Sequence, residues 1–346
     1  MDTAEFDYEL PPERIAQTSV EPRSAARLLV DEGPGRAPQH RRVADLAELL
    51  DPGDVLAVND TRVLAARVAL RRPSGAAVEA LLLERLEGRR WEALLRPSRR
   101  VHPGDVLEND AGLVVTALEP RGEGRWVVEL PPDAATEEAA AALLAVHGQI
   151  PLPPYISEPL ADPERYQTVY AARPVSAAAP TAGLHLTPEV LAACRAKGVT
   201  VAAVELAVGL GTFRPITATR VEDHRMHAEA YRIPPAALAA LERPAGQVVA
   251  VGTTVVRALE SWAATGRTEG RTELYLHGEA RFAVVQRLLT NFHVPRSSLL
   301  VLIDAFVGPR WRDLYEDALA AGYRFLSFGD AMLLQRRRGP RRADRG

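Results

Sequence analysis

The stretch "VADLAELLDPGDVLAVNDTRVL", residues 43–64, contains the pattern that decides the fold class. Its apolar residues recur at helical spacing up to residue 50, a "DPGD" turn follows, and "VLAV" (55–58) is a short apolar run typical of a buried strand. Three polar residues, Asn59, Asp60 and Thr61, come directly after this strand. A helix, a turn and a buried strand in this order indicate the layered α/β class, in which helices cover a sheet.

The rest of the chain shows two different sequence patterns. Beyond residue 160 helical and strand-like segments alternate, as in "TPEVLAACRAKG" (187–198) before "VTVAAVELAVG" (199–209). Between residues 63 and 147 short strand-like runs are instead separated by Gly/Pro turns, a spacing typical of a small antiparallel β-barrel. We therefore expect a discontinuous α/β domain (1–62 and 148–335), an inserted barrel domain (63–147) and a tail (336–346).

Composition excludes several classes of protein. Cys194 is the only cysteine, which excludes internal disulfides and a thiolate zinc site. Lys197 is the only lysine and lies at an expected helix end, which argues against a P-loop and against Schiff-base chemistry. We find no apolar run of membrane-spanning length and no secretory signal, so we expect a cytoplasmic protein with no membrane partner.

Charge is distributed unevenly along the 346 residues. The formal net charge is −3, yet residues 334–345 carry six arginines and one aspartate. We interpret this tail as a basic, disordered end, with phosphate binding as the alternative. The acidic remainder argues against a protein that binds nucleic acid over its whole surface.

Polar residues that follow predicted strands are candidates for ligand binding, because ligands of open α/β sheets lie beyond the carboxyl ends of the strands. Asp60 follows one strand, and Thr253 and Thr254 follow "VVAV" (248–251) at the start of a predicted helix. Backbone N–H groups at such a helix start bind carboxylates or phosphates. None of these turns matches G-x-G-x-x-G, so the sequence does not indicate a dinucleotide site.

Four of the eight histidines occur among other polar residues. His185 lies in the small-residue turn "APTAGLHLT" (179–187), His293 follows Asn291 in "TNFHVP", and His224 and His227 stand three apart in "EDHRMHAE". We interpret them as acid–base or ligand-orienting groups, roles that histidine fills near neutral pH. Two alternatives stay open: a metal site formed by His224, His227 and Glu229, and ordinary hydrogen-bonding surface histidines.

Ten sequence blocks occur in the order found in one enzyme family. They are "FDYELPPERIAQ", "NDTRV", "PLPPYI", "YQTVYA", "APTAGLH", "VGLGTFRPI", "EDHRMHAE", "VGTTVVRALES", "TNFHVP" and "YRFLSFGDAM". From about residue 6 to residue 333 the chain thereby resembles the S-adenosylmethionine:tRNA ribosyltransferase-isomerases of queuosine biosynthesis. The resemblance implies an α/β domain carrying an inserted β-barrel, S-adenosylmethionine as co-substrate, and no cofactor or metal.

The resemblance also implies the reaction and the site. The ribosyl group of S-adenosylmethionine passes to 7-aminomethyl-7-deazaguanine in the tRNA anticodon loop and rearranges to an epoxycyclopentanediol, while adenine and methionine leave. The product is epoxyqueuosine. Residues implied for acid–base work or ligand contact are His185, His224, His227 and His293. Residues implied for substrate binding are Asp60, Arg62, Thr181, Gly209, Gly211, Thr253, Thr254 and Asn291.

Two segments depart from the family pattern. Glu205-Leu206-Ala207-Val208-Gly209 stands where the family usually has Thr-Leu-His-Val-Gly, and Gly278-Glu279-Ala280 replaces a Pro-Gly-aromatic stretch. Besides the tRNA-modifying enzyme, two hypotheses therefore stay open: a diverged relative that uses S-adenosylmethionine with a small-molecule acceptor, and an inactive nucleoside- or RNA-binding protein. The sequence leaves the oligomeric state undefined and is compatible with a monomer.

Overall fold

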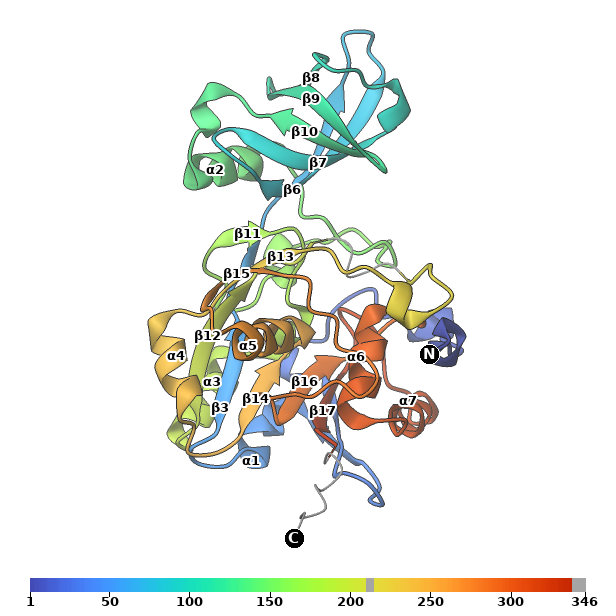
Figure 1. Cartoon of the computed structure of the whole chain (residues 1–346), viewed down its shortest axis with the longest axis vertical. Coiled ribbons are helices and arrows are strands. Elements are labelled where there is room, and N and C mark those ends of the chain that lie inside the picture. Colours follow the sequence, from blue (N-terminus) through green and yellow to red (C-terminus); the bar gives the residue numbers. More distant parts are fainter. Residues whose placement is uncertain (210–214, 338–346) are drawn as a thin grey trace.

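The computed structural model describes residues 1–209 and 215–337 and has two lobes, a barrel and a larger domain beneath it (Figure 1). The larger domain is built on a nine-stranded mixed sheet. Its strands, in spatial order, are β15 (Glu269–Thr272), β13 (Glu229–Arg232), β12 (Thr200–Leu206), β3 (Val55–Asn59), β14 (Val248–Val251), β16 (Arg287–Asn291), β17 (Ala331–Gln335), β1 (Arg27–Val30) and β2 (Gln39–Arg42). The layered α/β domain and the barrel expected from the sequence are confirmed.

The strand β3 lies in the middle of this sheet, as its uninterrupted apolar run predicts. It pairs in parallel with β12, where Val55 is opposite Thr200, and with β14, where Val55 is opposite Val248. Val55 and Ala57 point into one hydrophobic core, and Leu56 and Val58 point into another. Because a strand buried on both faces has no solvent side, its sequence shows no polar alternation.

Helices cover both faces of the sheet. They are α1 (Leu46–Leu49), α3 (Pro188–Ala196), α4 (Pro235–Glu242), α5 (Thr253–Thr265), α6 (Ser298–Val307) and α7 (Trp311–Ala320). Residues of α4 to α7 share one core, and residues of α1 and α3 share the other. Asp304, inside the apolar helix α6, accepts a hydrogen bond from Trp311 Nε1 at 3.1 Å, which satisfies a polar group in that core.

The second lobe is a closed antiparallel barrel. Its strands, in spatial order, are β10 (Arg125–Glu129), β7 (Arg90–Arg96), β6 (Ala77–Arg85), β5 (Arg67–Arg71), β8 (Val106–Glu108) and β9 (Val114–Gly122). The helix α2 (Glu137–His147) follows, and its buried Leu144 joins the barrel core with Trp91 and Trp126. Closure leaves no unpaired edge strand in the barrel.

The two lobes are joined by two neighbouring strands. The chain leaves the larger domain through β4 (Arg62–Val63) and returns through β11 (Pro174–Ser176), and these two short strands pair in parallel. At the far end of the chain, Arg336 donates to the carbonyl of Val285 and Arg337 donates to that of Gly278. The first two residues of the expected tail therefore contact the domain, and residues 338–346 lie outside the described part.

Among the described residues, no helix is both long enough and apolar enough to cross a membrane.

Candidate functional site

The carboxyl ends of β3, β12 and β14 meet at one edge of the sheet, where Asn59 connects them. The Asn59 amide nitrogen donates to the carbonyl of Leu206 (3.0 Å) and to Thr254 Oγ1 (3.4 Å), and its Oδ1 accepts from the Leu206 N–H. Asn59 is fully buried, so these bonds replace its contacts with water. The strand ends singled out by the sequence therefore belong to one hydrogen-bonded edge.

His185 lies at the neighbouring strand end and takes part in a polar chain with Asn291, the last residue of β16. Thr181 Oγ1 donates to Asn291 Oδ1 (3.0 Å), and Asn291 Nδ2 lies 3.0 Å from His185 Nε2 and donates to the carbonyl of Leu326. Because the amide nitrogen can only donate, His185 Nε2 accepts and the ring proton lies on Nδ1. The short 3₁₀ helix Thr181–His185 holds the histidine in this position.

Burial keeps His185 and His293 neutral. Desolvation, helped by the charges of Arg324 and Arg23, lowers the pKa of His185 from 6.5 to about 4. Desolvation lowers the pKa of His293 to about 3, and its Nε2 lies 3.0 Å from Thr290 Oγ1. Both imidazoles are therefore uncharged at pH 7 and act there through hydrogen bonds.

This burial predicts a pH-dependent stability. Between pH 6.5 and 4 the unfolded chain binds the His185 proton more readily than the folded chain, so stability decreases as the pH falls through this window. Between pH 7 and 4 we expect the free energy of unfolding to fall by up to about 3 kcal/mol less in His185→Asn than in the wild-type protein. Urea unfolding of both proteins across this range measures the difference. An equal pH dependence of the free energy of unfolding in the two proteins would contradict the assignment. The raised pKa of Asp60 acts in the opposite direction, but it affects both proteins equally.

His224 and His227 lie apart from this chain. His224 contacts the ring of Tyr275 edge-on, and partial burial lowers its pKa. His227 is exposed, and its ring nitrogens face Arg125 Nη2 of the barrel at 3.1 and 3.3 Å. The four histidines grouped by sequence therefore form two sets: His185 and His293 lie at the end of β16, and His224 and His227 lie on the segment before β13, where only His227 faces the barrel.

The open metal alternative for His224, His227 and Glu229 finds no support in these contacts. Glu229 is paired with an arginine, and no group of three or more metal-binding side chains occurs within residues 1–209 and 215–337.

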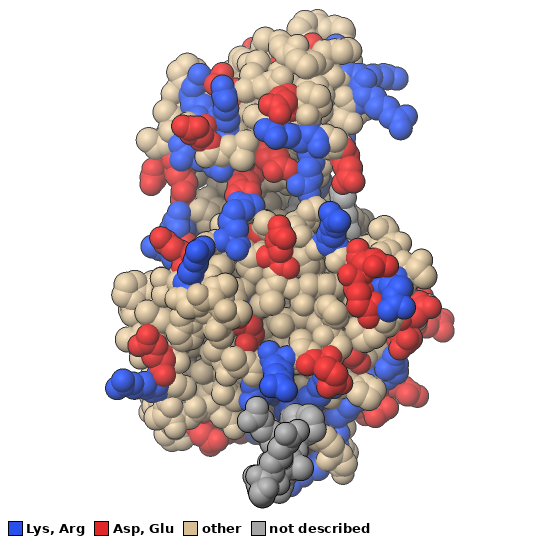
Figure 2. Space-filling model, in the orientation of Figure 1, with Lys and Arg blue, Asp and Glu red and all other residues tan. Residues whose placement is uncertain are grey.

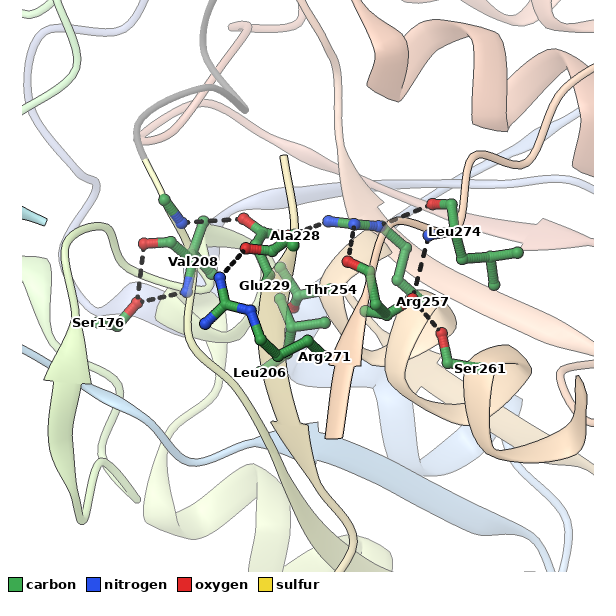
Figure 3. Close-up of polar contacts among 12 residues, drawn as sticks. Ser176, Leu206, Val208, Ala228, Glu229, Thr254, Arg257, Ser261, Arg271 and Leu274 are labelled. Carbon is green, nitrogen blue, oxygen red and sulfur yellow. Dashed lines mark hydrogen bonds and ion pairs between the residues drawn. The ribbon is translucent and has the colours of Figure 1, made fainter. Parts of the chain in front are cut away.

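Glu229 and Arg257 form a buried ion pair beside the end of β12 (Figure 3). Their side chains are 7% and 4% exposed. Glu229 Oε1 accepts the Gly209 N–H at 2.9 Å, and Arg257 donates to the carbonyls of Leu274 (3.1 Å) and Thr272 (3.3 Å). The pair thus fixes the backbone at Gly209, a residue predicted for substrate binding. Sequence reasoning missed Arg257; the only signal was an arginine within the otherwise apolar helix start "TTVVRAL".

Glu205, the departure from the family pattern, is held by two arginines. Arg173 Nη1 lies 2.6 Å and Arg232 Nε 3.0 Å from its carboxylate, which is 8% exposed. Arg173 also binds Glu137 of α2, on the barrel side, at 3.1 Å. Glu205 is therefore one member of an ion-pair cluster that connects the two lobes.

Asp60 lies close to this cluster. Burial, followed by the charge of Glu205, raises its pKa to about 6. Its Oδ1 is buried without a hydrogen-bond partner in the part of the chain that the structure describes. An acid with an unsatisfied buried oxygen and a pKa near neutrality is a candidate ligand-binding or proton-transfer group.

The other predicted residues have the following places. Thr253 is buried in the first turn of α5. Arg62 forms an ion pair with Glu164 and lines a large groove below the barrel. Gly211 lies outside the described residues.

A cavity of about 260 Å³ separates the barrel from the edge of the sheet. The barrel contributes Glu84, Glu92 and Arg125, and the larger domain contributes residues 207–209, 227–230 and Arg271. Arg271 binds Glu84 across the gap, with Nη2 3.1 Å from Oε2. Figure 2 shows charged side chains of both signs around the hollow between the lobes. Side chains of both lobes thus line the cavity, and the Arg271–Glu84 ion pair spans it.

Comparisons with known proteins agree on one family. A family model described as "Queuosine biosynthesis protein" matches residues 3–334. A protein from Rubrobacter xylanophilus named S-adenosylmethionine:tRNA ribosyltransferase-isomerase is 49% identical over 96% of this chain and 98% of its own. One of the same name from Moorella thermoacetica is 49% identical over 95% and 98%. The crystal structure of S-adenosylmethionine tRNA ribosyltransferase from Thermotoga maritima matches with a TM-score of 0.54, 35% identity, and coverage of 95% of this chain and 99% of that chain.

Proposed function

The chain belongs to the queuosine biosynthesis family of S-adenosylmethionine:tRNA ribosyltransferase-isomerases, and on this premise we infer that it performs the family's reaction. It transfers the ribosyl moiety of S-adenosylmethionine to 7-aminomethyl-7-deazaguanine in tRNA and isomerises it, giving epoxyqueuosine. Adenine and methionine leave. The observation that carries this conclusion is the 49% identity over nearly the full length of both proteins.

We propose that S-adenosylmethionine binds at the carboxyl edge of the sheet. Thr253 and Thr254 start α5, where free N–H groups favour a carboxylate such as that of the methionine moiety. Asp60 provides an acceptor for a hydroxyl or ammonium group. These two groups follow β14 and β3, which are paired strands.

His185 is proposed as a hydrogen-bond donor at this edge. Its Nε2 is occupied by Asn291, and its Nδ1 carries the proton. A neutral imidazole in this tautomer can donate to a leaving-group nitrogen, and adenine must leave with its nitrogen stabilised. Removal of a proton at C5′ beside the sulfonium needs a separate base, for which Asp60 is the candidate because of its raised pKa.

The acceptor base is proposed to enter the cavity between the lobes. The aminomethyl group is a cation and the guanine edge presents N–H donors, so both would replace Arg271 and Arg125 as partners of the Glu84 and Glu92 carboxylates that line the cavity. Glu205 gives no reason to choose a small-molecule acceptor instead, because it does not line this cavity and its carboxylate is bound by Arg173 and Arg232.

The proposed domain boundary at residue 62 is supported by β4, through which the chain leaves the larger domain. The proposed boundary between 63–147 and 148–335 is supported by α2, which ends at His147 and packs on the barrel core. S-adenosylmethionine is treated as a substrate and no bound cofactor or metal is invoked. The tRNA anticodon loop is the proposed macromolecular partner. The proposed location is the cytoplasm, where tRNA occurs.

Adenine release tests the function. The purified protein is incubated with S-adenosylmethionine and an anticodon stem-loop that carries 7-aminomethyl-7-deazaguanine, and a stem-loop with guanine at that position serves as control. We expect release of adenine and methionine, and a matching mass gain of the RNA, only with the modified stem-loop. Release that ignores the RNA would indicate another acceptor, and no release at all would indicate an inactive binding protein.

A further inference from the structure

A groove on the barrel lies directly beside the cavity. It has a volume of about 570 Å³ and is lined by Arg96, Ser98, Arg99, Trp126 and the turn 122–125. Glu123 and Arg125 line both the groove and the cavity. The two depressions are therefore neighbours, separated by the β9–β10 turn.

Three exposed arginines at or next to this groove have unpaired side chains, unlike several others on the barrel. Arg71, Arg72, Arg89 and Arg121 each form an ion pair with a carboxylate of the barrel. In contrast, the exposed Arg96, Arg99 and Arg100 form no ion pair and donate no hydrogen bond to any residue that the structure describes.

The loop between β7 and β8 arranges these unpaired arginines. Ser98–Arg100 form a single 3₁₀ turn, and Val101 at its end is buried in the barrel core. Arg99 and Arg100 lie on this turn and Arg96 ends β7 just before it, so the three guanidinium groups lie close together in the chain, on a protein whose net charge is −3. A local cluster of free positive charge on an acidic protein favours the binding of a polyanion at that place.

We propose that this groove binds the RNA backbone on either side of the acceptor base, with Arg96, Arg99 and Arg100 as the phosphate contacts. The proposal rests on the proposed function. A base that reacts through the aminomethyl nitrogen on its C7 must leave its stack to enter a cavity, and the phosphates flanking it then lie next to the cavity entrance. Guanidinium groups bind phosphate oxygens bidentately, which suits this role better than lysine. Trp126, which also lines the groove, is 5% exposed, so the barrel core supports the groove floor.

Charge reversal tests the surface. We expect Arg96→Glu/Arg99→Glu to raise the KM for the modified stem-loop about 10–100-fold, while the KM for S-adenosylmethionine and the kcat at saturating RNA change less than about twofold. Loss of two phosphate contacts also lowers the slope of log KM against log salt by about 1–2. The neutral variant Arg99→Gln should give a smaller change in the same direction.

A matched control is Arg195→Glu, an exposed arginine on α3 of the larger domain, which should leave the KM for RNA unchanged. Circular dichroism and thermal melting establish that each variant is folded. An unchanged KM for RNA in the folded double variant, or an equal rise in the Arg195 variant, overturns the proposal. Failure of the proposed function is a different result, because the wild-type protein itself would then release no adenine in response to the modified RNA.

Discussion

Replacing Arg257 with methionine is expected to lower the free energy of unfolding by about 3–5 kcal/mol. The substitution removes the arginine that is ion-paired with the buried Glu229 carboxylate, which is 7% exposed, and with it the donors to Leu274 and Thr272. Methionine fills much of the space, so the loss reflects the broken ion pair more than a cavity. Urea unfolding followed by tryptophan fluorescence measures it.

Two further variants make this prediction specific. Arg267→Met removes an exposed arginine just beyond the same helix and should change stability by less than about 0.5 kcal/mol. The double variant Glu229→Gln/Arg257→Met removes both charges and should regain part of the loss, giving a coupling energy in a double-mutant cycle. A loss below about 1 kcal/mol in Arg257→Met would show that the pair does not stabilise the fold.

The second large effect is expected in catalysis. His185→Ala should lower kcat about 10²–10⁴-fold while leaving the KM for S-adenosylmethionine within about threefold. The loss is confined to kcat because a hydrogen bond to a departing nitrogen strengthens in the transition state. The rate of adenine release with saturating modified stem-loop gives both constants.

Asn291→Ala tests whether catalysis depends on the orientation of the His185 ring and not only on its presence. This variant keeps the imidazole but removes the amide that orients it and fixes its tautomer, so kcat should fall here too. His102→Ala, an exposed histidine of the barrel, is the matched control and should retain full activity. Wild-type kcat in His185→Ala would exclude this residue from the reaction.

The features that local sequence determines were predictable. The run 55–58 predicted β3, because a buried parallel strand has a characteristic composition. The polar residues after it follow the carboxyl end of that strand, and their role in ligand binding stays a prediction. The even spacing of short strands between residues 63 and 147 likewise predicted the barrel, which the structure confirms.

What depends on the order of strands in space was not predictable. Glu229 is the first residue of β13 and Arg257 lies in α5. The two side chains meet only because β13 pairs with β12 on one side of the sheet, close to α5. His227 faces Arg125 only because the barrel rests against that same edge. No local pattern encodes either adjacency, so the split of the four histidines into two sets, and the cavity between the lobes, required the three-dimensional arrangement.

The pairing of β1 with β17 has a consequence for the order of folding on the ribosome. Leu28 pairs with Ala331, so one of the first strands to be synthesised gains its parallel neighbour only when almost the whole chain has been made. The barrel, by contrast, contains all its strands once residue 129 has emerged. We expect the inserted lobe to fold co-translationally while the surrounding sheet is still incomplete, and a nascent chain that stops before residue 331 to expose the unpaired edges of β1 and β16 to chaperones and aggregation.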